Sequence, residues 1–201
     1  MARYGSHHAQ ATREKILNAA ALSFKAEGLN TVGIGRLMGQ AGLTHGGFYA
    51  HFRSKDALVQ ETLARSLRAT STTLLQAASQ TPPYGLGGVI RSYVSRQHRD
   101  QPESAASCVL PALAAEIARQ APEVRNAFTT TLMELIGELS ALSPADSPAA
   151  RRAEVLPLLC GMVGAVMLAR AVTDPDLSDA ILKTTRERLT AQLSAGVPRS
   201  T

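Results

Sequence analysis

The stretch GLNTVGIGRLMGQAGLTHGGFYAHFRSKDAL, residues 28–58, decides the fold. Its first part repeats apolar residues at i, i+3, i+4 and i+7, which predicts a short amphipathic helix. The repeat consists of Ile34, Leu37, Met38 and Ala41. Thr31 is placed to cap this helix, and Gly42 is placed to end it with a left-handed residue.

A second short helix is expected directly after this turn. Thr44 is placed to cap it, and Phe48 and Phe52 share one of its faces. Ser54 then caps a longer helix, with Asp56 near its positive end. Two short helices joined by a glycine turn are typical of a helix-turn-helix, whose second helix lies in the major groove of DNA.

The rest of the chain also shows helical rather than strand-like patterning. An apolar face ended by Gly28 predicts a helix over residues 12–27, which would brace the motif. The helix that Ser54 opens is stopped near residue 80 by Pro82 and Pro83. Further helices are expected over residues 89–98, 106–117, 122–139, 149–172 and 177–195. Pro111 marks either a kink or a helix start.

The run FYAHFRSKDAL after AGLTHGG resembles the DNA-binding domain of the TetR family of transcriptional repressors. The resemblance covers about residues 12–60, and the remainder agrees with the family only in length and helical character. It implies an all-α chain with an N-terminal three-helix helix-turn-helix DNA-binding domain, residues 1–57. A C-terminal helical ligand-binding and dimerisation domain would follow over residues 58–201, with the long connecting helix starting near residue 54.

The charge distribution agrees with a DNA partner. The net charge is +5, and residues 1–68 hold nine of the 21 Lys and Arg but only four of the 16 Asp and Glu. The remaining residues are neutral overall, so the positive excess lies on the helix-turn-helix segment, where phosphates would be met. A basic surface that only aids solubility is the alternative reading.

Several other classes of protein are disfavoured. Cys108 and Cys160 are too few for a disulfide framework or a metal site, and no cofactor is expected. We find no metal-ligand spacing, phosphate loop or nucleophile elbow, so no enzyme is predicted. The N-terminus lacks the apolar run of a signal peptide, and the uncharged run 155–169 is short for a membrane span. A cytoplasmic protein without a membrane partner is expected.

The expected DNA contacts follow from the motif and the resemblance. Tyr49 and Lys55 match family positions that touch phosphates, whereas His51 serves either packing or phosphate contact. Gly46 and Gly47 cannot reach base edges with side chains, so direct readout falls to Thr44, His45 and Arg36, or to DNA shape. The candidate DNA-binding residues are Thr31, Arg36, Thr44, His45, Gly46, Gly47, Tyr49, His51 and Lys55.

The resemblance also implies a pocket in the helical body for a small-molecule effector that cannot be named from the sequence. The candidate pocket residues are Arg91, His98, Cys108, Glu116 and Phe128. Polar members of this set equally fit a surface role or a role with partners inside the chain. Cys108 is either an electrophile sensor near a helix N-terminus or an inert buried residue, and Cys160 is expected to be structural.

A homodimer is expected, because helix-turn-helix proteins usually bind DNA as symmetric dimers. Gly161, Ala165 and Ala169 repeat at i, i+4 and i+8 beside Gly164, which predicts a close helix–helix interface. Packing inside one subunit is the alternative. The resulting hypothesis is a ligand-responsive repressor that binds a palindromic double-stranded operator and is released by a small molecule or an electrophile. A helical small-molecule-binding protein without specific DNA binding is the competing hypothesis.

Overall fold

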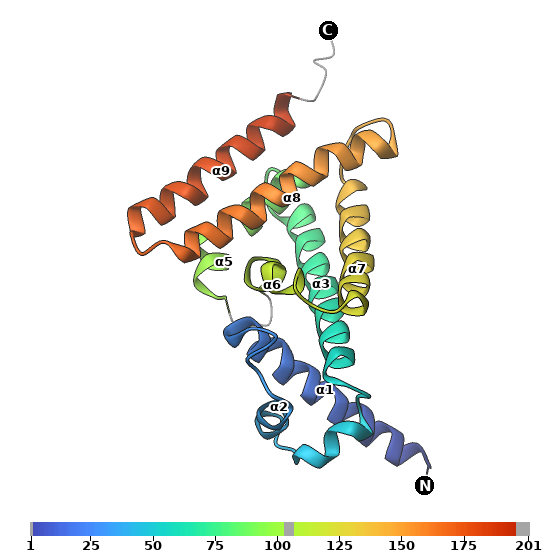
Figure 1. Ribbon diagram of the computed structural model, residues 1–201. Helices are drawn as coiled ribbons and strands as arrows, with labels where there is room; N and C mark the ends of the chain where they lie inside the picture. Colours follow the sequence, from blue (N-terminus) through green and yellow to red (C-terminus); the bar gives the residue numbers. More distant parts are fainter. Residues whose placement is uncertain (1, 103–106, 196–201) are drawn as a thin grey trace. The chain divides into compact units, whose positions relative to one another are not determined.

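The computed structural model describes residues 2–102 and 107–195, and every regular element in these ranges is helical (Figure 1). The predicted all-α class is therefore confirmed. In chain order the elements are α1 (Ala2–Glu27), α2 (Ile34–Gln40), the 3₁₀ helix η1 (His45–Ala50), α3 (Lys55–Gln80), α4 (Leu86–Tyr93), α5 (Arg96–Asp100), α6 (Leu110–Ile117), α7 (Pro122–Ser140), α8 (Pro148–Ala171) and α9 (Pro175–Ala195).

Most of the predicted helix ends are correct, because they depend on local residues. Gly28 follows α1 with φ +87°, and Gly42 follows α2 with φ +72°, both in the left-handed region. The Ser54 hydroxyl accepts a hydrogen bond from the Ala57 N–H at 3.1 Å and so caps α3. Pro111 lies in the first turn of α6, so it starts the helix rather than kinking it.

Three local predictions are wrong. Gly33, not Thr31, is the N-cap of α2. Thr44 is the N-cap of η1 as predicted, although its side chain accepts no hydrogen bond there. The helix expected over residues 89–98 is two helices, α4 and α5. It breaks because Val94 leaves the helical conformation and Ser95 caps α5 by accepting a hydrogen bond from the His98 N–H. Helix α1 starts at Ala2, ten residues before its predicted beginning.

The chain forms two compact units that do not follow the predicted boundary at residues 57 and 58. The first unit combines Met1–Leu67 with Glu103–Thr131, and the second combines Arg68–Pro102 with Leu132–Thr201. The reason is that α6 packs against α1, which brings a segment of the expected ligand domain into the same unit as the helix-turn-helix. Helices α3 and α7 each start in the first unit and end in the second.

The core of the first unit holds α1, α2, η1 and the first half of α3 together. Phe48 of η1 is fully buried and stacks on Phe52 with ring centroids 5.7 Å apart. The guanidinium of Arg13 lies 4.5 Å above the Phe52 ring and forms an ion pair with Glu61, which raises the pKa of Arg13. Helices α1 and α3 are thus tied by a charged pair above an aromatic core.

The second unit is built on the antiparallel pair α8 and α9, which lie side by side in Figure 1. One face of α8 is buried, and α4 and α5 also pack against α8. By length and composition α8 is long and apolar enough to cross a membrane, but core helices meet the same criterion. Its buried face consists of Val155, Leu158, Leu159, Met162, Ala165, Val166 and Ala169.

Candidate nucleic-acid interface

The turn between α2 and η1 fixes which side of η1 faces outward. Leu43 donates its N–H to the Met38 carbonyl at 2.8 Å, and Gly42 donates to the Gly39 carbonyl at 3.0 Å, which closes α2. Helix η1 then packs against α2 through Phe48, which is fully buried. Because this side of η1 is anchored in the core, the side chains on its other side are left facing solvent.

All nine predicted DNA-binding residues lie in the first unit, and most of them are exposed. Tyr49 has 64% of its surface exposed although its ring meets Phe48 edge-on, with centroids 5.2 Å apart. An exposed tyrosine held by a buried aromatic ring is well placed to meet a phosphate. The exposed members are Thr31, Arg36, Thr44, His45, Gly46 and Tyr49, and the half-buried ones are Gly47, His51 and Lys55.

Packing does not explain the two glycines at the leading edge of η1. A Cβ atom added at Gly46 would meet no atom within 4 Å. At Gly47 a Cβ would meet the Met38 side chain at 3.7 Å, an ordinary van der Waals contact. Both positions therefore have room for a side chain, and their exposed backbone is free to approach another surface closely.

Two of the predicted cationic contacts have partners within the unit. Arg36 forms an ion pair with Glu27 at 2.6 Å, yet 60% of its side chain is exposed. Surface pairs of this kind are worth less than about 1 kcal/mol, so a phosphate or a base could replace Glu27. Lys55 donates a long hydrogen bond of 3.5 Å to the Asn30 carbonyl. This contact holds its ammonium beside the turn that precedes α2.

Arg53 is a further candidate that was not predicted from the sequence. It is exposed, lies between His51 and Lys55, and has no hydrogen-bond or ion-pair partner among the described residues. The available signal was its charge, since it stands directly before the Ser54 cap in the basic segment of the chain. Together with Lys55 it places two cations at the start of α3.

Glu116 has a role that differs from the predicted pocket contact. Its carboxylate accepts a hydrogen bond from the Leu29 N–H at 2.7 Å. Gly28 has a left-handed φ of +87°, and a Cβ atom there would collide with the same carboxylate, so glycine permits this approach without strain. Gln120 adds a hydrogen bond of 3.1 Å to the Asn30 side chain. Glu116 and Gln120 therefore fasten the α6 end of the unit to the turn that leads into the helix-turn-helix.

The other predicted pocket residues are divided between the two units. Arg91 is exposed, and His98 places Nδ1 2.8 Å from the Tyr93 carbonyl oxygen, both in the second unit. Cys108 is 1% exposed and Phe128 is half-buried, both in the first unit. None of these residues, nor Glu116, lines the cleft that the second unit forms between α7 and α8.

The predicted dimer stripe on α8 is largely an internal packing surface. Ala165 and Ala169 are buried within the subunit, and Gly161 faces Leu189 of α9. Only Gly164 has open space beside it. Gly161 therefore allows α8 to pack closely on α9 of the same chain, and a dimer interface through these small residues stays a prediction.

A different face of α8 is both apolar and exposed. Leu156 and Met167 have 38% and 44% of their surface exposed, and Cys160, expected to be structural, is exposed as well. With the half-buried Val163 they follow one another at intervals of three or four residues, so they share one side of the helix. We call Leu156, Cys160, Val163 and Met167 the outer stripe of α8.

A metal site is not formed by the described residues, which contain no group of three or more His, Cys, Asp and Glu side chains able to hold an ion. The chemistry that the first unit offers is instead that of a surface with exposed polar side chains, unpaired Arg53 and open backbone at η1. These are the groups that contact phosphates and base edges in protein–DNA complexes.

Comparison with known proteins agrees with this geometry. The sequence model of the family described as "Bacterial regulatory proteins, tetR family" matches residues 16–62. The HTH-type transcriptional regulator AcrR of Shigella flexneri is 38% identical over 61 residues. That match covers 30% of this chain and only 28% of the length of AcrR, so it concerns one segment of each protein.

Solved structures match nearly the whole chain. SCO4454, a TetR-family transcriptional regulator from Streptomyces coelicolor, is 26% identical with a TM-score of 0.61 and covers 91% of this chain and 96% of its own. The reduced form of NemR from E. coli is 20% identical, with a TM-score of 0.70 and coverage of 89% and 95%. A TetR-family regulator from Cytophaga hutchinsonii is 17% identical, with a TM-score of 0.75 and coverage of 96% and 98%. The last two show a shared fold.

Proposed function

We propose that this chain, whose residues 16–62 match the TetR family of bacterial regulatory proteins, is a DNA-binding repressor whose η1 enters the major groove of an operator. The observation that carries the proposal is the exposed face of η1 on a helix-turn-helix anchored by the buried Phe48. A rigid anchor of this kind fixes the position of the residues that meet DNA.

We assign two kinds of contact to the interface. Lys55, Arg53 and Tyr49 would bind phosphates, which fixes the register of the protein on DNA without reading its sequence. Thr44, His45 and Arg36 would read base edges, with Thr31 and His51 at the margins. Gly46 and Gly47 would bring the backbone of η1 close to the groove. Since the glycines offer no side chains, DNA shape is expected to contribute to specificity.

We propose that the protein acts as a homodimer on a palindromic operator. The outer stripe of α8 offers an apolar surface, and exposed apolar patches of this kind mark protein contacts. A two-fold axis through this surface would pair two copies of the same patch. The two η1 helices would then bind half-sites about one DNA turn apart, roughly 34–36 Å.

We further propose that a small molecule or an electrophile releases the protein from DNA. Helices α3 and α7 continue from one compact unit into the other and provide a covalent route for such a signal. A cytoplasmic location and the absence of catalysis follow from the same proposal. The competing function, a helical small-molecule-binding protein without specific DNA binding, would require no exposed reading face on η1.

The assigned roles are tested with two substitutions measured on a set of related DNA sequences. We expect Lys55→Ala to weaken binding to all sequences by about tenfold, because a phosphate contact carries no sequence information. We expect His45→Ala to change the order of preference among them. Arg125→Ala removes an exposed cation of α7 and serves as the matched control, with unchanged affinity expected. Equal effects of Lys55→Ala and His45→Ala on every sequence would contradict the assignment.

A further inference from the structure

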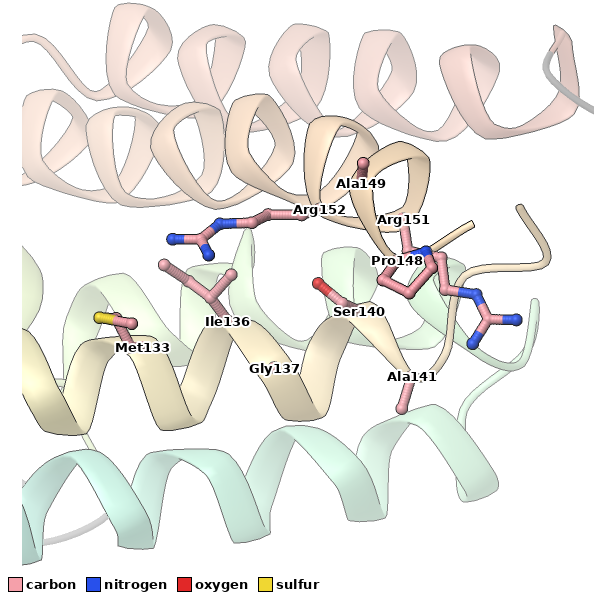
Figure 2. Close-up of a pocket in the computed structure, with 9 residues that line it drawn as sticks. All are labelled: Met133, Ile136, Gly137, Ser140, Ala141, Pro148, Ala149, Arg151 and Arg152. Atoms are coloured by element: carbon pink, nitrogen blue, oxygen red, sulfur yellow. The ribbon is translucent and has the colours of Figure 1, made fainter. Parts of the chain in front are cut away.

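The second unit contains a cleft of about 560 Å³ between the C-terminal half of α7 and the first turns of α8 (Figure 2). Its apolar walls include Met133 and Ile136 from α7 and Pro148 from α8. The volume lies within the range of about 300–1,000 Å³ that is typical of small-molecule sites. No carboxylate side chain lines this cleft.

A hydroxyl group on the floor of the cleft lacks a partner. Ser140 Oγ is buried and has no hydrogen bond within the described chain. Figure 2 shows this oxygen pointing from α7 toward the start of α8, into the space that the cleft occupies. Burying an unsatisfied hydroxyl costs free energy, so a polar group placed there by a ligand would remove a penalty.

Two arginines supply the charge of the cleft. Arg152 is exposed, has no partner among the described residues, and extends its guanidinium beside Ile136 and Met133 in Figure 2. Arg151 donates a hydrogen bond from Nε to the Ala145 carbonyl oxygen at 2.7 Å, and this bond holds its side chain at the other end of the cleft. Guanidinium groups bind carboxylates strongly and with defined geometry.

Gly137 keeps the floor of the cleft open. Glycine inside a helix is disfavoured by about 1 kcal/mol relative to alanine. Packing does not demand glycine here, because a Cβ atom at this position would meet nothing within 4 Å. Packing within the unit therefore does not explain why glycine stands at position 137. The absence of a side chain there leaves space for a ligand.

We propose that this cleft binds an organic monocarboxylate with an apolar body. The carboxylate would accept hydrogen bonds from Arg152 and the Ser140 hydroxyl, and the apolar body would lie over Gly137 against Ile136 and Pro148. The inference rests on the proposed function only in naming this ligand as the effector. Binding itself requires no DNA, so the two hypotheses fail separately.

The test uses the full-length protein, without DNA, in calorimetric titrations with two probes. Decanoate represents an extended carboxylate, and 2-naphthoate represents a flat one. We expect at least one to bind, and its uncharged alcohol, 1-decanol or 2-naphthalenemethanol, to bind at least tenfold more weakly. Arg152→Gln should weaken binding at least tenfold, whereas Arg125→Gln, which removes an exposed cation outside the cleft, should not.

Gly137 offers a second test that preserves folding. Gly137→Leu should fill the cleft and abolish binding, while Gly137→Ala should retain it, and both should keep or raise the melting temperature. Failure of both carboxylates to bind, or equal binding by wild type and by the Arg152→Gln and Gly137→Leu variants, would overturn the proposal. A loss of the dimer in Gly137→Leu would also overturn it, because a second copy would then occupy the cleft.

The role of the ligand is tested last, by adding the bound carboxylate to a protein–operator complex. We expect release from DNA in wild type and no release in Gly137→Leu. If the carboxylate binds and the complex persists, the naming of the ligand as effector is overturned. If the protein binds no DNA, the proposed function fails, and the calorimetric result still decides whether the cleft is a carboxylate site.

Discussion

At the scale of single residues, the first turn of η1 contains two glycines, Gly46 and Gly47, which have no side chains. Gly46 is exposed and has open space where a Cβ atom would stand. Folding therefore does not require glycine at this position, and the proposed close approach to DNA does. Stability and DNA affinity should respond differently to a methyl group placed here.

We expect Gly46→Ala to leave the free energy of unfolding within about 0.5 kcal/mol of wild type, or to raise it, because the surface position is unstrained. The same change should weaken operator binding by about tenfold, equivalent to about 1.4 kcal/mol. Urea unfolding and fluorescence anisotropy measure the two quantities. Unchanged DNA affinity would show that the backbone of η1 does not approach the groove closely.

Asp179 of α9 predicts a pH dependence in the second unit. Hydrogen bonds from Arg96 and then from Arg99 hold the pKa of Asp179 below its ordinary value, and Arg99 likewise lowers the pKa of Asp100. A lowered folded-state pKa means that the stabilisation is complete above the unfolded-state value of about 3.9. It is lost as the pH falls through the folded-state pKa.

We therefore expect Asp179→Asn to be less stable than wild type at pH 7, with the difference disappearing in stronger acid. Asp146→Asn is the control, because this exposed carboxylate has no partner in the described chain. Chemical unfolding followed from pH 7 down to pH 2 measures both variants. A stability difference for Asp179→Asn that stays constant over this range would rule out the ion pairs as its source.

At the scale of elements, α6 is tied to the turn between α1 and α2. The link is the hydrogen bond from the Leu29 N–H to Glu116, which spans 87 residues of sequence. The sequence places Glu116 near an apolar helix face, and this led to its prediction as a pocket residue. Local periodicity cannot identify a partner so far along the chain, which is why this contact was missed.

We expect Glu116→Ala to destabilise the protein by about 1–3 kcal/mol, because it leaves a buried N–H without an acceptor. Glu116→Gln should lose less, since its amide oxygen still accepts the hydrogen bond. Urea unfolding of the two variants measures the difference. Equal stability of Glu116→Ala and wild type would mean that water replaces the carboxylate and that the link contributes nothing.

Helix α8 illustrates a second limit of sequence patterns. The repeat of Gly161, Ala165 and Ala169 predicts close helix packing, and its sequence left open whether the neighbour belongs to the same subunit or to a partner. Gly161 faces Leu189 of α9 in the same chain, and Ala165 and Ala169 are buried. A pattern of small residues predicts that another helix packs closely against it. Only the three-dimensional structure identifies that helix.

At the scale of the whole molecule, the features set by neighbouring residues were predictable and those set by distant ones were not. The helix-turn-helix, the Gly42 turn and the Ser54 cap follow from local sequence, and the structure confirms them. The composition of the two units depends on contacts between distant segments. The candidate ligand cleft likewise requires the end of α7 to meet the start of α8.

The proposed dimer is tested with the outer stripe of α8. We expect Met167→Glu to yield a folded monomer, because this exposed side chain would make its apolar contacts across the proposed interface. Leu177→Glu, on the exposed start of α9, is the matched control and should remain dimeric. Light scattering gives the mass and circular dichroism the helix content. A Met167→Glu protein of unchanged dimeric mass would remove the outer stripe from the interface.

The most direct measurement is fluorescence anisotropy of the full-length protein with DNA from upstream of its own gene and with a shuffled sequence of the same composition. A sequence-specific repressor should bind the upstream DNA at least a thousandfold more tightly, with affinity falling steeply as salt rises because counterions are released. Equal and weak binding to both sequences would contradict the proposed repressor and would favour a helical small-molecule-binding protein.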